Sequence, residues 1–161
     1  MAIFVQTEDF DLSTEVAKLR AHSPKVGAIV SFVGVVRDLN EGLDVQSMEL
    51  EHYPGMTEKA LQEIVAEAQR RWALMECLVI HRVGLLQPLD QIVLVAVASA
   101  HRGEAFAACE FIMDYLKTQA AFWKKEQTPE GHRWVDARET DDLALAKWGL
   151  VSNNAVAKSV P

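Results

Sequence analysis

Three lysines lie beside two aromatic residues late in the chain. Lys117, Lys124 and Lys125 surround Phe122-Trp123, where the most apolar predicted helix ends. The helix macrodipole favours cations at a C-terminus, so capping with snorkelling side chains explains any one of them. Paired cations beside aromatic rings, however, are typical of an anion site or of a lysine with a lowered pKa. Lys117 and Lys124 are about two helical turns apart, so their ammonium groups would lie on one side if the helix continued.

A second group of polar residues, Ser99-Ala100-His101-Arg102, lies where an apolar strand gives way to that helix. Free backbone N–H groups and the positive dipole end of a helix N-terminus bind phosphate, and His101 and Arg102 would add donors. A His101 that merely caps the helix is an equally good reading. Arg37 and Arg138, expected at two other strands, are further candidates, although an isolated arginine there is more often a surface ion-pair partner.

The histidines and cysteines in the apolar segments favour structural readings. His52 shares a predicted strand face with Met48 and Leu50, and His81 lies inside an apolar run, so each is expected to be a core or half-buried residue. Cys77 and Cys109 occupy apolar positions away from a helix N-terminus, so neither is expected to be a nucleophile. No spacing of cysteines and histidines typical of a zinc site occurs, so no metal is expected.

Composition excludes several functional classes. The 161 residues carry 16 Lys plus Arg against 23 Asp plus Glu, a formal net charge of −7, so a basic nucleic-acid-binding surface is not expected. No apolar run approaches the ~18 residues of a membrane span. Two cysteines are too few for a disulfide framework, and the acidic N-terminal region does not resemble a secretion signal. These observations indicate a cytoplasmic protein without nucleic-acid or membrane partners.

The elements that must position the candidate residues follow from hydrophobic periodicity. A first short helix is expected with Ser13 as its N-cap. Further helices are expected from Thr57 to Trp72, from Gly103 to Thr118 and from Asp141 to Trp148, and strands over 26–36, 45–53, 75–83, 91–98 and 132–139. Strands interleaved with helices predict one α+β domain over residues 1–149, with a mixed or antiparallel sheet. Residues 150–161 lack periodicity and are expected to be a weakly ordered tail.

Several motifs together resemble the catalytic large subunit of molybdopterin synthase. They are Glu51-His52-Tyr53-Pro54-Gly55-Met56, Ser99-Ala100-His101-Arg102, Met113-Asp114-Tyr115-Leu116-Lys117-Thr118 and Phe122-Trp123-Lys124-Lys125-Glu126, and the likeness extends in matching order from about Val26 to Trp148. The resemblance implies an α/β-hammerhead fold with a small additional antiparallel β subdomain. It also implies a homodimer within a heterotetramer, with one small ubiquitin-like sulfur-carrier subunit at each end.

The same resemblance implies a reaction. The carrier's C-terminal Gly-Gly thiocarboxylate would deliver sulfur to cyclic pyranopterin monophosphate, and two transfers would form the dithiolene of molybdopterin, with no cofactor in this subunit. Lys117 and Lys124 match the catalytic lysines. The expected substrate-binding residues are Arg37, His101, Arg102, Lys125, Glu126 and Arg138. The chain departs from the family at Ala121, where proline is common, so the bend between the two lysines is expected to be softer.

Helix length adds a prediction about assembly. Sixteen residues separate His101 from Lys117, which corresponds to about 24 Å along a straight helix. One small pterin cannot bridge that distance, so His101 and Arg102 of one protomer are expected to complete the pocket that holds Lys117 of the other. Two alternatives without turnover are an adaptor that binds a ubiquitin-like carrier tail and a sensor of a phosphate ligand.

Overall fold

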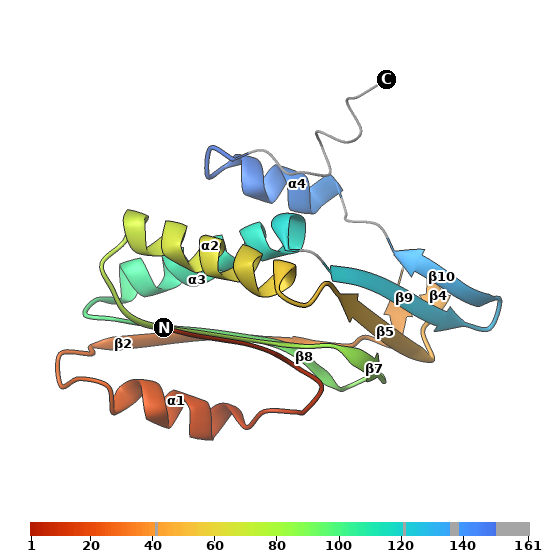
Figure 1. The fold of residues 1–161 in the computed structure, drawn as a ribbon, viewed down its shortest axis with the longest axis horizontal. Helices are drawn as coiled ribbons and strands as arrows, with labels where there is room; N and C mark the ends of the chain where they lie inside the picture. Colours follow the sequence, from red (N-terminus) through yellow and green to blue (C-terminus); the bar gives the residue numbers. More distant parts are fainter. Residues whose placement is uncertain (41, 121, 136–138, 151–161) are drawn as a thin grey trace.

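A four-stranded sheet forms the centre of the computed structural model, which describes residues 1–40, 42–120, 122–135 and 139–150 (Figure 1). Its strands are β1 (Ala2–Gln6), β2 (Ala28–Val35), β6 (Leu74–Arg82) and β8 (Gln91–Ser99). The spatial order is β1-β6-β8-β2, with β1 parallel to β6 and the other neighbours antiparallel. β8 is therefore an inner strand and β2 an edge strand.

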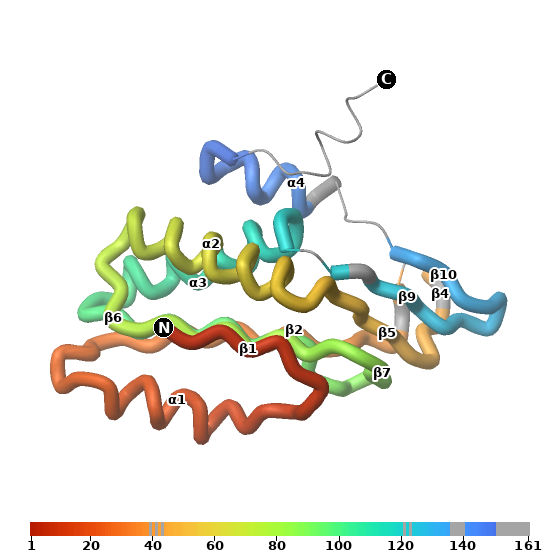
Figure 2. The backbone as a smooth tube through the Cα atoms, viewed as in Figure 1, coloured from red at the N-terminus to blue at the C-terminus, as the bar shows by residue number. Residues whose placement is uncertain are grey.

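Helices cover both faces of this sheet (Figure 2). The helices are α1 (Leu12–Arg20), α2 (Met56–Arg71), α3 (Arg102–Gln119) and α4 (Glu139–Ala146). α1 lies on one face, α2 and α3 lie on the other, and α4 lies outside α3. On β8, Val95 and Val97 pack toward α2 and α3, whereas Leu94 and Ala96 pack toward α1. Burial on both faces explains why β8 is an uninterrupted apolar run.

A second four-stranded sheet extends beyond one end of the main sheet (Figure 1). Its strands are β5 (Ser47–His52), β7 (Gly84–Leu86), β9 (Phe122–Thr128) and β10 (Gly131–Val135). The order is β10-β9-β5-β7 and every pairing is antiparallel. The short strands β3 (Leu39–Asn40) and β4 (Leu43–Asp44) pair separately.

The predicted α+β class is confirmed by four helices and two larger sheets in the described ranges. α2 and α3 agree with the predicted helices to within one residue. The predicted cap of the first helix is wrong, because the Asp11 carboxylate, and not Ser13, accepts a hydrogen bond of 2.7 Å from the Thr14 backbone N–H. Of the tail expected to be weakly ordered, residues 151–161 lie outside the described part of the chain.

α3 does not continue as far as Lys124. The helix ends at Gln119, and β9 begins at Phe122 and pairs with β5 on one side and β10 on the other. These pairings satisfy backbone groups that a continued helix would have satisfied internally. The two lysines therefore come from different elements: Lys117 from the last turn of a helix and Lys124 from a strand. Within the described ranges, no helix is both long enough and apolar enough to span a membrane.

Candidate active site

A cavity of about 580 Å³ opens where both sheets meet the C-terminal end of α3. One part of its wall is apolar and includes Phe32, Val33, Met48, Leu50, Ile92 and Leu116. The charged and polar part includes Arg37, Asn40, His81, Lys117, Lys124 and Glu126. An apolar wall facing a few converging polar groups is the usual construction of a small-molecule site.

Lys117 and Lys124 both line this cavity, so they lie close together as the sequence predicted. They do so from a helix and a strand, and not from one continued helix. Lys117 is an exposed residue directly after the buried Leu116 in the last turn of α3. On β9, Phe122, Lys124 and Glu126 line the cavity because side chains alternate along a strand. The end of the helix and one face of the strand thus bring two cations to the same space.

Lys125 lies on the opposite face of β9. It pairs in register with Trp134, and its ammonium nitrogen lies 5.6 Å from the centre of the Trp134 ring. It is absent from the cavity lining. The structure therefore does not bring Lys125 together with Lys117 and Lys124, and a cation–π contact accounts for its position.

Glu126 lies at the base of the cationic wall and is 1% exposed. Its Oε1 accepts a hydrogen bond of 2.6 Å from the Asn40 amide and lies 3.3 Å from the Lys124 ammonium, while its Oε2 accepts one of 3.1 Å from Arg133. Burial alone would raise the pKa of Glu126, but Arg133, Lys124 and Asn40 outweigh it and hold that pKa below its ordinary value. The ionised carboxylate holds the Lys124 ammonium in place. Glu126 therefore positions a neighbouring cation and is itself almost inaccessible to a ligand.

Arg37 also lines the cavity, two residues beyond the end of β2. Backbone hydrogen bonds fix this strand end: Val36 donates to Asp90 and accepts from Leu89, both at 2.9 Å. Arg37 thereby adds a third cation to those of Lys117 and Lys124. Of the predicted candidates, Arg138 lies outside the described residues, as does Ala121.

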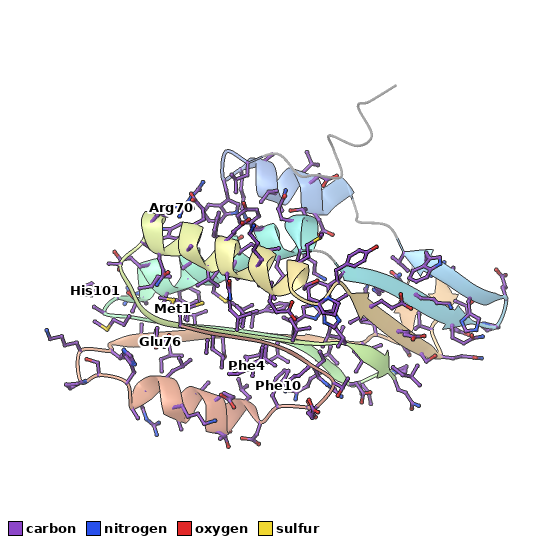
Figure 3. All side chains as sticks on the ribbon, viewed as in Figure 1. Met1, Phe4, Phe10, Arg70, Glu76 and His101 are labelled. Atoms are coloured by element: carbon purple, nitrogen blue, oxygen red, sulfur yellow. The ribbon has the colours of Figure 1, made fainter. Side chains whose placement is uncertain are left out.

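His101 and Arg102 lie at the other end of α3, at its N-cap and first position. Figure 3 shows His101 at the end of the molecule opposite the second sheet. Both are exposed, and neither lines the cavity. The His101 backbone N–H donates to the Ser99 hydroxyl at 3.4 Å, and that hydroxyl also contacts Glu104 at 3.0 Å, which holds the turn in place. Within one protomer the two groups of candidate residues are separate.

His81 is buried, as its apolar run predicts, but it is also a cavity residue. It is 5% exposed, yet it lines the cavity, and its ring stacks on Phe122 with centroids 3.8 Å apart. A signal was present in the sequence. On β6, Cys77 and Val79 pack toward α2 and α3, so alternation places His81 on that face, one residue before the strand ends. A polar residue on the inward face of a strand, close to the end of that strand, was thus a sign that His81 could line a cavity.

Both cysteines are buried free thiols, as predicted. Burial raises the pKa of Cys77 to about 12 and that of Cys109 to about 11. Neither supplies a thiolate at neutral pH. In the described part of the chain, no three His, Cys, Asp or Glu side chains are grouped so as to hold a metal ion.

The fold and the site define an α+β protein with a cavity lined by three cations. The chain belongs to the MoaE protein family, whose model matches residues 5–119. It is 68% identical over 155 residues to the molybdopterin synthase catalytic subunit of Ralstonia nicotianae, which covers 96% of this chain and 88% of the relative. It is 56% identical over 146 residues to that of Escherichia coli, covering 91% and 97%.

Solved structures agree with this assignment. The molybdopterin biosynthesis MoaE protein of Burkholderia ambifaria matches with a TM-score of 0.81 and 66% identity, covering 93% of this chain and 99% of that one. Molybdopterin synthase of Staphylococcus aureus matches with a TM-score of 0.75 and 32% identity, covering 83% and 96%. By family and relatives, the function is that of a molybdopterin synthase catalytic subunit, a sulfur-transferring enzyme of molybdenum cofactor biosynthesis.

Proposed function

We propose that the cavity is the place where sulfur is transferred from the C-terminal thiocarboxylate of a small ubiquitin-like carrier to cyclic pyranopterin monophosphate. The observation that carries the proposal is the convergence of Arg37, Lys117 and Lys124 on one cavity in a chain of net charge −7. Both reactants are anions, so a local concentration of cations would attract them and stabilise charge that develops during transfer. Sulfur arrives with the carrier, which agrees with two buried, unreactive thiols.

Each cation has its own role in this proposal. Lys117, exposed at the helix end, contacts the carrier's acyl end or moves a proton during transfer, as general acid or base. Lys124 is held in a fixed position by Glu126 and offers a stationary charge to the reacting group. Arg37 binds the phosphate, because a guanidinium donates two parallel hydrogen bonds to such a group. The apolar wall accommodates the ring system of the pterin.

A symmetric homodimer is part of the proposal, and one observation supports it. α3 spans Arg102–Gln119, so His101 and Lys117 lie about 24 Å apart by helical rise and cannot contact one small ligand within a protomer. His101 and Arg102 of one protomer would complete the cavity of the other, in the isologous manner of a two-fold dimer. Relatives named as a catalytic subunit support a further subunit, which we propose is the carrier at each end of a heterotetramer.

The overall arrangement supports an α/β-hammerhead architecture with the second sheet as its small subdomain. The two cysteines, both free, support a reducing compartment such as the cytoplasm.

The decisive experiment supplies the purified chain with thiocarboxylated carrier and cyclic pyranopterin monophosphate and measures dithiolene formation. Lys117→Ala is expected to reduce turnover by at least about a hundredfold, since general acid–base groups contribute on that scale. Lys117→Arg is the matched variant, because it keeps the charge but not the proton chemistry. An enzyme with Lys117→Arg keeps carrier binding and loses turnover, whereas an adaptor or a sensor has no turnover to lose and keeps its binding function. Near-normal turnover of Lys117→Ala would refute the assigned role.

A further inference from the structure

His81 lines the cavity, and none of the roles proposed above involves it. Its Nδ1 lies 2.8 Å from the backbone carbonyl oxygen of Arg82. A carbonyl oxygen only accepts, so Nδ1 carries the hydrogen and donates. The other nitrogen, Nε2, has no hydrogen-bond partner among the described residues, yet it is not sealed from solvent. Phe122 covers one face of the ring, and the cavity is the open space beside it.

The imidazole is neutral under physiological conditions. Burial is the largest effect and lowers the pKa of His81 to about 4, and the charges of Lys117 and His52 act in the same direction. The hydrogen bond to Arg82 opposes them but is outweighed. A neutral ring that donates through Nδ1 has a lone pair on Nε2. Nε2 of this cavity-lining residue is therefore available as a hydrogen-bond acceptor.

Donors outnumber acceptors among the charged side chains that line this cavity, where Glu126 and Asp141 are the carboxylates of the described residues. Arg37, Lys117 and Lys124 can only donate. The Glu126 carboxylate already accepts from Asn40 and Arg133 and pairs with Lys124. A ligand that carries N–H groups as well as negative charge needs acceptors for those groups, because unpaired buried donors weaken binding. A neutral acceptor such as an imidazole nitrogen can meet an N–H group without repelling the ligand's negative charge, as the Asp141 carboxylate would.

We propose that Nε2 of His81 accepts a hydrogen bond from an N–H or O–H group of the substrate's ring system and thereby sets the orientation of that ring in the cavity. The inference rests on the proposed function, in which the substrate is a pterin with N–H donors beside an anionic phosphate. The cations hold the phosphate, whereas His81 distinguishes one ring orientation from another. His81 is thus a substrate-binding residue that determines specificity.

Two substitutions in the full chain separate this role from a structural one. His81→Asn places an amide donor near the Nδ1 position and removes the acceptor at Nε2, whereas His81→Gln places an amide oxygen near Nε2. Binding of the cyclic pterin is measured by calorimetry, together with kcat and KM in the presence of thiocarboxylated carrier. His81→Asn is expected to raise the Kd and KM about tenfold to a hundredfold with a smaller change in kcat. His81→Gln is expected to stay within about threefold of wild type.

Sulfate provides the control, because it is an anion without hydrogen-bond donors. Its affinity, measured by competition, is expected to be the same in both variants and in wild type, and the melting temperatures show that each variant is folded. Unchanged pterin affinity in His81→Asn would overturn the inference, as would parallel losses of sulfate and pterin affinity, or equal losses in His81→Gln. If wild-type protein binds the pterin, and His81→Asn weakens that binding, but no dithiolene forms, the proposed function alone is contradicted. A wild type that does not bind the pterin contradicts both.

Discussion

At the scale of single residues, β9 places neighbouring charged side chains on opposite faces of one strand. Lys124 and Glu126 face the cavity, whereas Lys125 faces outward over Trp134. The sequence placed all three charged residues in one site, because their types and proximity predict an anion-binding stretch. Which of them share a face depends on whether the segment is helix or strand, and that depends on pairing with β5 and β10.

Glu126→Gln tests the buried carboxylate. The substitution keeps the shape but leaves Lys124 and Arg133 beside a neutral amide, so we expect a loss of about 3 kcal/mol in the free energy of unfolding and a clear fall in turnover. Glu130→Gln, at an exposed position on the β9–β10 turn, is the matched control and is expected to change neither. Urea denaturation and initial rates measure both effects.

The same carboxylate predicts a pH dependence of stability. The pKa of Glu126 is lowered in the folded protein, so its contribution is present above the pKa of the unfolded chain and is lost as pH falls through the lower folded value. Wild type is therefore expected to lose more stability on acidification than Glu126→Gln. Parallel denaturation curves of the two proteins between about pH 6 and pH 3 would contradict this assignment.

The cysteines give a second prediction at this scale. With pKa values of about 12 and 11, Cys77 and Cys109 are expected to react with a thiol reagent such as Ellman's reagent only after unfolding. The double variant Cys77→Ala/Cys109→Ala is expected to keep sulfur transfer, since the sulfur comes from the carrier. Rapid labelling of the native protein at neutral pH would contradict the first expectation, and loss of turnover in a folded double variant the second.

At the scale of elements, the sequence predicted the helices and strands whose own residues form a continuous apolar face. The helical periods of α2 and α3 and the apolar runs of β6 and β8 are visible in the sequence because each buries a continuous apolar face. β1, β7 and β9 were not predicted, because their strand character comes from partners far along the chain, as in the pairing of β1 with β6. The site was predicted in part for the same reason: Arg37, Lys117 and Lys124 converge, whereas the role of His81 required its neighbours.

Gly27 directly precedes β2 and packs closely against the turn before α3, where its backbone N–H donates to the Ser99 carbonyl oxygen at 3.0 Å. A Cβ atom there would lie 2.2 Å from the Ala100 carbonyl oxygen, so Gly27→Ala must displace the backbone next to His101. We expect Gly27→Ala to cost about 1–3 kcal/mol in the free energy of unfolding. Gly103→Ala meets nothing within 4 Å and is expected to be neutral or stabilising by up to about 1 kcal/mol. Equal stabilities of the two variants would contradict the close approach.

At the scale of the whole molecule, α3 separates two groups of basic residues. The cavity group lies at its C-terminal end and His101 and Arg102 lie at its N-terminal end. The whole chain has a net charge of −7, which disfavours anions on most of its surface, so we expect anions to bind at these two basic regions. A two-fold dimer can bring the N-terminal end of one helix to the cavity of its partner, and two equivalent composite sites would result.

Hybrid dimers test that arrangement. If each site combines Lys117 of one protomer with Arg102 of the other, a dimer of one Lys117→Ala chain and one Arg102→Ala chain has one intact site and one doubly defective site. Random mixing makes about half of the dimers hybrid, so about a quarter of wild-type turnover is expected to return. Each variant alone is the control and should remain inactive. Hybrids shown to form by differential tagging but lacking turnover would exclude a shared site.

The cavity lies at the seam between two sheets, and each sheet has its own backbone pairing. Because the apolar core under α2 and α3 belongs to the main sheet, substitutions on the cavity face of β5 and β9 can change the accepted ligand without entering that core. Met48, Leu50 and Glu126 are best kept, because each is buried within the second sheet. A library confined to those two strands is therefore a practical starting point for engineering this scaffold to accept other heterocyclic phosphates.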